Sequence, residues 1–315
     1  MKWCVIGAGG IADRRTIPAI LKDEKSELVA VMDMVESTAK AIGEKYGVKY
    51  FTSEKEMLSS VECDAVYIGT PVFKHYEQAM LALSFNKHVF VEKPIAMNVE
   101  EGEKLVKAFK EAGKLLCVGY MMKYHNLHNK AKEIIANDGI GAGNNVRAQF
   151  SCWYPDIKGA WRQTKALGGG GAIMDLAVHC IELVEDILEE EIIDVKAFYS
   201  TKTFSYEVDD CAVIIFKTES GALGHIDVNF NIPDNASVSK LELYGEKGYV
   251  ICTGTLAQEE KGVLSHLYSP QGDYVAAQNR TTDKPEEYYG ADTNLYLKQL
   301  IKFREQVESG SLDYF

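Results

Sequence analysis

Short apolar runs alternate with amphipathic segments along the first 120 residues. The runs are apolar almost throughout, which is typical of parallel strands buried on both faces, and they lie at residues 3–6, 28–32, 65–68, 88–91 and 115–118. Apolar residues at helical spacing fill the segments between them, at residues 11–21, 36–46, 73–84 and 99–112. This alternation predicts an α/β domain with a doubly wound parallel sheet of the Rossmann type, covered by helices on both faces.

The pattern changes after residue 122. Helical spacing recurs at residues 127–137, 173–185 and 294–308, and strand candidates lie at residues 146–153, 195–203, 211–218, 222–230 and 240–244. Strands grouped apart from helices predict an α+β domain with a largely antiparallel, open sheet. We therefore expect a first domain at residues 1–122 and a second at 123–315, with the last helix packing back near the first. Residues 254–292 show no pattern that predicts an element.

Composition narrows the class of protein. A length of 315 residues suggests about two domains, and 46% hydrophobic and 25% charged residues are ordinary for a soluble globular protein. No run approaches the roughly 18 apolar residues of a membrane span, and the run at 3–6 is too short for a secretory signal. With 34 basic and 46 acidic residues the net charge is −12, and no basic cluster offsets it, which argues against nucleic-acid and membrane-surface partners.

The cysteines favour a cytoplasmic location. They are odd in number, form no CxxC pair, and several lie inside apolar runs: Cys4, Cys63, Cys117, Cys152, Cys180, Cys211 and Cys252. We expect reduced, buried thiols.

The first motif that indicates chemistry is Gly7-Ala8-Gly9-Gly10-Ile11-Ala12, a GxGxxA sequence between a strand and a helix. Its glycines permit a tight turn and a close approach to a pyrophosphate, which the helix N-terminus then attracts. Asp33 ends the second strand, where an acid binds the ribose hydroxyls of the adenosine. Together these features predict dinucleotide binding at Gly7, Gly9, Gly10, Ile11 and Asp33. An ordinary strand–helix turn with a capping acid is the alternative.

Asp33 also favours NAD over NADP. A carboxylate at this position accepts from the 2′-hydroxyl and repels a 2′-phosphate, and Met34 follows where an arginine would favour NADP. Binding of NADP stays an alternative, because the side chain of Lys40 or Lys45 is long enough to reach a phosphate.

The second motif is Glu92-Lys93-Pro94, which ends an apolar strand abruptly. Ligands of parallel sheets bind at the carboxyl ends of the strands, so Lys93 is a candidate for the catalytic centre. An exposed Glu–Lys pair at a loop start is the alternative.

The third motif is four glycines at 168–171, followed by a helix that carries Asp175 and His179. Residues four apart share one helical face, and an imidazole oriented by a carboxylate is a plausible general base. A helix N-terminal acid with a core histidine is the alternative. A metal site lacks an evident third ligand, so we expect no metal.

These motifs, in this order and spacing, resemble the Gfo/Idh/MocA oxidoreductase family over nearly the whole chain. The resemblance is to its sugar-active branch, with 1,5-anhydrofructose reductases and aldose or inositol dehydrogenases. It implies catalytic roles for Lys93, Asp175 and His179. It adds cofactor contacts at Thr70, Pro71, His75, Glu92, Lys93, Trp161, Arg162 and Tyr296. It adds substrate contacts at Tyr120, Lys123, Tyr124, Trp161 and Arg162.

The implied function is an NAD(P)-dependent hydride transfer between nicotinamide and a carbohydrate or polyol carbon. An NAD-dependent glycosidase and a non-catalytic NAD-binding sensor on the same fold are the alternatives. The resemblance also implies a homodimer or homotetramer formed through the open sheet.

Overall fold

The computed structural model describes residues 1–258, 260–274, 276, 283–291 and 293–312. The chain forms two compact units. The first comprises residues 1–120, 164–169 and the last helix from Tyr296 on, and the second comprises residues 121–163 and 170–295. The first boundary thus lies at residue 120, and the last helix is part of the first unit.

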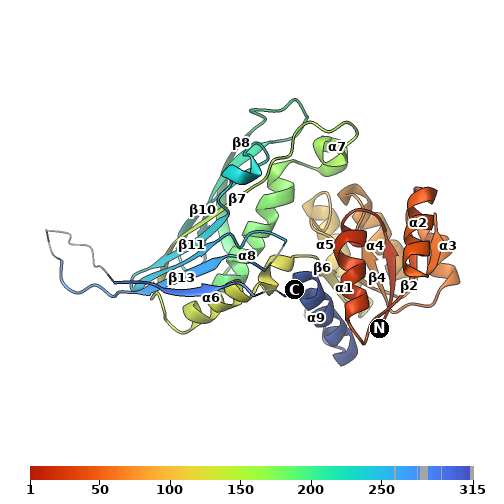
Figure 1. Ribbon diagram of the computed structural model, residues 1–315, viewed down its shortest axis with the longest axis horizontal. Helices are drawn as coiled ribbons and strands as arrows, with labels where there is room; N and C mark the ends of the chain where they lie inside the picture. Colours follow the sequence, from red (N-terminus) through yellow and green to blue (C-terminus); the bar gives the residue numbers. More distant parts are fainter. Residues whose placement is uncertain (259, 275, 277–282, 292, 313–315) are drawn as a thin grey trace. The chain divides into compact units, whose positions relative to one another are not determined.

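The first unit is built on a six-stranded parallel sheet (Figure 1). Its strands are β1 (Lys2–Ile6), β2 (Glu27–Met32), β3 (Lys49–Phe51), β4 (Ala65–Ile68), β5 (His88–Val91) and β6 (Leu116–Val118). Their order, β3-β2-β1-β4-β5-β6, is that of doubly wound sheets, in which ligands bind at the carboxyl ends of the strands.

Helices cover both faces of this sheet. They are α1 (Ile17–Lys22), α2 (Glu36–Tyr46), α3 (Glu54–Ser60), α4 (His75–Ser84), α5 (Val99–Glu111) and α9 (Leu295–Ser309). The short α7 (Lys165–Gly168) also belongs to this unit. A π-helical turn, Ala12–Thr16, precedes α1, and a 3₁₀ turn, Val72–Lys74, precedes α4. Because strand residues on both faces are buried, the strands read as unbroken apolar runs.

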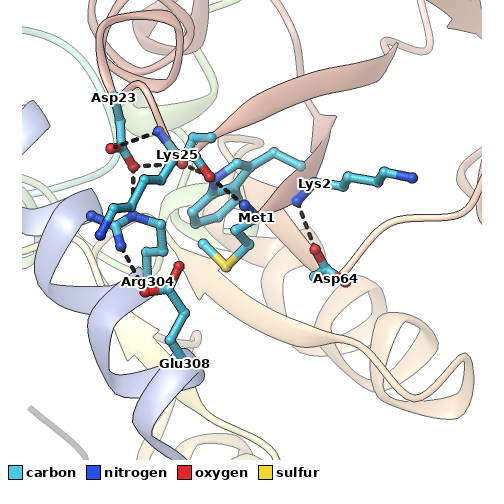
Figure 2. Close-up of polar contacts among 9 residues, drawn as sticks. Met1, Lys2, Asp23, Lys25, Asp64, Arg304 and Glu308 are labelled. Carbon is cyan, nitrogen blue, oxygen red and sulfur yellow. Dashed lines mark hydrogen bonds and ion pairs between the residues drawn. The ribbon is translucent and has the colours of Figure 1, made fainter.

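The last helix is anchored to the first unit by aromatic and ionic contacts. Phe303 packs against Trp3 and Phe90, with ring centroids 5.2 and 5.5 Å apart. Arg304 Nε lies 2.7 Å from Asp23 Oδ2, and both side chains are almost wholly buried (Figure 2). This helix therefore covers the face of the sheet that carries Trp3 and Phe90.

The second unit contains an eight-stranded mixed sheet (Figure 1). Its strands are β7 (Gly143–Ser151), β8 (Ile192–Ser200), β9 (Cys211–Thr218), β10 (Leu223–Asn229), β11 (Lys240–Gly245), β12 (Gly248–Thr253), β13 (Val263–Tyr268) and β14 (Glu286–Tyr289). Their order is β14-β13-β12-β11-β7-β10-β9-β8, and every neighbouring pair is antiparallel except β7 and β10. The expectation of a largely antiparallel sheet is confirmed.

Helices α6 (Asn126–Ala136) and α8 (Val178–Leu188) belong to this unit. Alternate residues of the central strands are buried, as in Ala212, Ile214 and Phe216 of β9, whereas Val213 and Ile215 between them are exposed. This period of two indicates one face packed on the helices and one open face.

Six of the helices and strands that the structure describes were not predicted from the sequence: β3, α3, the four-residue α7, β12, β13 and β14. Strand β3 has three mostly exposed residues, and α3 has seven, so both are too short for a clear period. Strands β12, β13 and β14 lie at one side of the second sheet, and of β13 only Leu264 is buried. Of residues 254–292, which we left unassigned, positions 259, 275, 277–282 and 292 lie outside the described residues.

No disulfide links any of the seven cysteines, all of which the structure describes. One segment, Lys165–Leu188, is long and apolar enough to cross a membrane, and half of its most apolar window is buried inside the protein. That burial is what a core helix shows, so the segment is weak evidence for a membrane span.

Candidate active site

The glycine-rich turn after β1 forms one wall of a cleft of about 690 Å³ in the first unit. The cleft opens where β1, β2 and β4 end, and predicted cofactor residues line it: Gly7, Gly9, Gly10, Asp33, Thr70 and Pro71. Gly7 has a φ of +79°, and a Cβ there would lie 2.9 Å from backbone atoms of Gly69 and Thr70. Only glycine fits this turn without displacing the neighbouring strand end. Ile11 is the N-cap residue of the π turn that follows.

Asp33 is held in place by two backbone donors. Its Oδ2 accepts from the Gly9 N–H at 3.3 Å, and its Oδ1 accepts from the Val35 N–H at 3.0 Å. The carboxylate thereby joins the end of β2 to the glycine turn inside the cleft. Lys45, which we considered for a phosphate, instead binds Asp13 at 2.7 Å.

His75 joins two loops that carry predicted site residues. Its Nε2 lies 2.8 Å from the Thr70 carbonyl oxygen and its Nδ1 lies 2.8 Å from the Pro94 carbonyl oxygen. Both partners are acceptors, so a ring nitrogen that carries a proton donates to the carbonyl beside it. His75 is 1% exposed, and its ring holds the backbone of the turn at Thr70 and the backbone of the loop after Lys93 in place.

Glu92 faces a buried tyrosine. Its Oε1 accepts from the Tyr67 hydroxyl at 2.7 Å, and burial, followed by the Glu92 charge, raises the pKa of Tyr67. Burial, again followed by Glu92, raises the pKa of Tyr296. Tyr67 was not singled out from the sequence, because an aromatic residue inside a buried strand resembles ordinary core. Lys93 follows Glu92 and is half-buried, and Tyr120 ends the first unit.

Gly171, the last of the four glycines, allows a close backbone contact in the second unit. A Cβ on Gly171 would lie 1.9 Å from the Asp209 carbonyl oxygen. The Asp209 carboxylate accepts from the N–H groups of Gly171 and Ile173, at 2.8 and 2.9 Å. Asp209 therefore caps the helix that carries Asp175 and His179, a role the sequence did not reveal.

Asp175 lies in a π-helical turn, Ile173–Ala177, and its carboxylate pairs with an arginine side chain. Arg162 Nε donates to its Oδ1 at 3.3 Å, and the Arg162 guanidinium lies over the Trp161 ring at 4.3 Å. The Tyr154 hydroxyl also hydrogen-bonds Arg162, and burial raises the pKa of Tyr154 although Arg162 opposes that shift. The structure thus brings together three predicted site residues, Trp161, Arg162 and Asp175. It adds Tyr154, which was not predicted from the sequence.

His179 is 4% exposed, and its ring meets Phe150 of β7 edge to face, with centroids 6.4 Å apart. One turn further along α8, Glu182 Oε1 lies 2.8 Å from Lys123 Nζ. Lys123 and the half-buried Tyr124 come from a 3₁₀ turn, Met121–Tyr124. The second unit thus places Asp175, His179 and Glu182 on one side of a single helix. Among the described residues, no group of three or more His, Cys, Asp and Glu side chains suits a metal ion.

Two family models match this chain. Residues 1–120 match the family model "Oxidoreductase family, NAD-binding Rossmann fold", and residues 128–251 match "GFO/IDH/MocA C-terminal domain". The 1,5-anhydro-D-fructose reductase of Ensifer adhaerens is 27% identical over 86% of this chain and 81% of its own length. The glucose-6-phosphate 3-dehydrogenase of Bacillus subtilis is 27% identical over 91% of this chain and 83% of its own length.

Among solved structures, an aldose-aldose oxidoreductase from Caulobacter crescentus superposes with a TM-score of 0.86. It is 23% identical, and the match covers 98% of this chain and 90% of that one. This likeness shows that the two chains share their fold.

Proposed function

The chain belongs to the Gfo/Idh/MocA family of NAD(P)-dependent oxidoreductases, and we propose that it transfers a hydride between NAD and a hydroxyl or carbonyl carbon of a sugar or polyol. The observation that carries this proposal is the combination of two sites in one chain. The first unit has a glycine-walled cleft with Asp33, and the second has a capped helix with Asp175 and His179. The relatives named above are a reductase and a dehydrogenase, which favours this function over the glycosidase and the sensor.

The residues of the first unit fit a dinucleotide. A Cβ on Gly7 would fill the turn that a pyrophosphate approaches, and the following helix N-terminus offers its first N–H groups. Asp33 would accept from the ribose hydroxyls, and Thr70 and Pro71 line the same cleft. When bound, the nicotinamide supplies the hydride acceptor or donor.

The chain's own residues would manage the proton and the charge. In the oxidative direction, His179 would accept the hydroxyl proton, and Asp175, itself held by Arg162, would orient the ring. Lys93 would stabilise the negative charge that develops on the reacting oxygen. In the reductive direction the same groups would return the proton. Trp161 offers a flat apolar surface for a sugar face.

A direct test mixes the purified protein with NAD, and separately with NADP, across sugars, inositols and sugar phosphates. Turnover is followed by the near-ultraviolet absorbance of the reduced nicotinamide. Net reduction of NAD by a sugar or polyol is the expected result. Hydrolysis of aryl glycosides without net absorbance change would favour the glycosidase, and NAD binding without any turnover would favour the sensor.

The cofactor preference rests on Asp33, because its charge repels a 2′-phosphate. An Asp33→Asn variant is expected to bind NAD about 10–100-fold more weakly, which is the size of a lost charged hydrogen bond, and to bind NADP more tightly. Titration of each cofactor by calorimetry measures both changes. Glu54→Gln is the matched control, since Glu54 lines the same cleft, and its NAD affinity should stay within about threefold. Tighter binding of NADP than NAD by the unaltered protein would contradict the preference.

The open face of the second sheet supports a homodimer or homotetramer. Phe198 is 85% exposed, and Val213, Ile215 and Leu223 beside it are each about half exposed. The strand registers place all four on the open face, opposite the buried residues of β9. Contiguous exposed apolar residues of this kind mark interaction surfaces, and in a homo-oligomer the same patch serves both copies.

A Phe198→Glu variant is therefore expected to dissociate the oligomer. It would place a charge in the middle of an apolar interface, which weakens association by about tenfold or more. Light scattering coupled to size-exclusion chromatography measures the mass. Tyr199→Glu is the control, because Tyr199 is also exposed but its side chain points to the other face of β8. An unaltered protein that is monomeric at micromolar concentration would refute the oligomer.

A further inference from the structure

A buried ion pair lies next to the proposed catalytic histidine. Lys123 Nζ is 2.8 Å from Glu182 Oε1, and the two side chains are only 17% and 16% exposed. Glu182 follows His179 by three positions on α8, so the two residues are neighbours on the helix surface. The resemblance to the family implied a substrate contact for Lys123, whereas nothing in the sequence drew attention to Glu182.

The charges on this side of α8 are matched. Arg162 pairs with Asp175, Lys123 pairs with Glu182, and further along the helix Lys132 of α6 pairs with Asp186 and Glu189, at 3.3 and 3.1 Å. The β7 residues that face the helix, Val146 and Ala148, are apolar. A sugar hydroxyl can hydrogen-bond to such pairs without displacing either partner. A phosphate or carboxylate has to compete with Glu182 for the Lys123 ammonium.

We propose that Glu182 is a specificity-determining residue that neutralises Lys123 and so restricts the substrate to uncharged sugars and polyols. Sugar phosphates and sugar acids are disfavoured because a second anion would lie beside the Glu182 carboxylate. This inference rests on the proposed oxidoreductase function. It also predicts whether the substrate carries a charge. Similarity does not decide this, because the named relatives include both an anhydro-sugar reductase and a sugar-phosphate dehydrogenase.

The arrangement implies a dependence on pH. Burial raises the pKa of Glu182 to about 7, against the opposing effect of Lys123, and Asp186 and Glu185 on the same helix raise it further. Above this pH the carboxylate is charged and balances Lys123. As the pH falls through about 7, Glu182 takes up a proton and the Lys123 charge is left uncompensated. Discrimination against anionic substrates should therefore weaken in acid.

The test compares pairs of substrates that differ by one charged group, such as D-glucose with D-glucuronate and D-galactose with D-galacturonate, because a sugar carboxylate stays ionised over the pH range used. For each pair, kcat/KM is measured with NAD at pH about 8 and about 6, for the unaltered protein and for Glu182→Gln. We expect the unaltered protein to prefer the uncharged partner at the higher pH. We expect Glu182→Gln to lower that preference by about tenfold and to remove its pH dependence.

Two further variants control for indirect effects. Asp186→Asn removes a carboxylate one turn along the same helix, while Lys132 keeps Glu189, and should leave the preference unchanged at pH about 8, where Glu182 is charged in both proteins. Lys123→Met should lower turnover of uncharged substrates without any gain for sugar acids. Thermal unfolding of each variant checks that the fold is intact.

The outcomes separate this inference from the function on which it rests. Absence of turnover with every substrate would overturn both. Turnover with an unchanged preference in Glu182→Gln, an equal change in Asp186→Asn at pH about 8, or a preference of the unaltered protein for sugar acids would overturn this inference alone. If Glu182→Gln does not fold, the comparison of the two pH values on the unaltered protein becomes the test. A preference for uncharged substrates that is the same at both pH values then refutes the role of Glu182.

Discussion

A His179→Gln variant is expected to lose about 10²–10⁴-fold in kcat and still to bind NAD normally. His179 would remove the hydroxyl proton as the hydride leaves, and a glutamine amide has no basic nitrogen with which to do so. NAD affinity should be preserved, because the cofactor cleft is lined by residues of the first unit, whereas His179 belongs to the second. Steady-state kinetics and a calorimetric titration with NAD measure the two quantities separately.

Two companion variants show whether His179 acts within a catalytic group. Lys93→Met should lower kcat by about 10²–10³-fold, the usual effect of losing one donor to a developing oxyanion. Residues that act as a unit are not additive, so the double variant should be only slightly slower than the poorer single variant. Cys180→Ala, adjacent on α8, is the control for disturbance of the helix. A His179→Gln protein with nearly normal kcat would remove His179 from the mechanism.

The sequence predicts the first unit well because its signals are local. Parallel strands buried on both faces give unbroken apolar runs, and the turn after β1 must be glycine because of the Gly69 and Thr70 backbone beside it. Short elements give no comparable signal. Strand β3 and helix α3 are too short to show a clear hydrophobic period, and their place is set by packing against β2.

The candidate site shows the same division between local and distant causes. The spacing of Asp175 and His179 can be read from the chain, because helical neighbours are four positions apart. The four glycines indicate a close approach, but not that its partner is Asp209, some 38 positions away. Likewise, the contacts of Arg162, Tyr154 and Glu182 depend on elements brought together only by folding. The two backbone contacts of His75 are a further example, because the sequence does not show that its ring nitrogens lie against the carbonyl oxygens of Thr70 and Pro94.

The last helix provides a second large effect, this time on stability. Replacing Arg304 with methionine is expected to destabilise the protein by about 3–5 kcal/mol, because the Asp23 carboxylate would be left buried without its cation. Figure 2 shows the arrangement: Arg304 Nε lies 2.7 Å from Asp23 Oδ2, and its Nη1 lies 2.8 Å from Glu308 Oε2. The two buried partners are only 5% and 6% exposed, whereas Glu308 is 47% exposed. Calorimetry should show the melting temperature of the first unit falling by about 6–12 °C.

Glu308→Gln is the matched control on the same helix. It removes the solvent-exposed partner of Arg304 and should cost at most about 1 kcal/mol. A double variant, Asp23→Asn with Arg304→Met, should be more stable than the sum of the two single changes predicts, because it leaves no buried charge unpaired. Equal costs for Arg304→Met and Glu308→Gln would show that the Asp23 pair contributes nothing beyond a surface contact.

The loss of stability in Arg304→Met should depend on pH, and this dependence identifies the Asp23 carboxylate as the source of the loss. Burial alone would raise the pKa of Asp23, but hydrogen bonds from Ser26 and Arg304 outweigh that effect and lower it below its usual value. A carboxyl group with a lowered pKa in the folded state stabilises the protein above its unfolded pKa of about 3.9, and that stabilisation is lost as the pH falls through the folded value. The gap in unfolding free energy between the unaltered protein and Arg304→Met should therefore be full near neutrality and shrink in acid below about pH 4. Urea titrations followed by Trp3, whose buried ring packs on Phe303, measure this gap at each pH, and a gap that stays constant into acid would assign the loss to packing of the arginine stem instead.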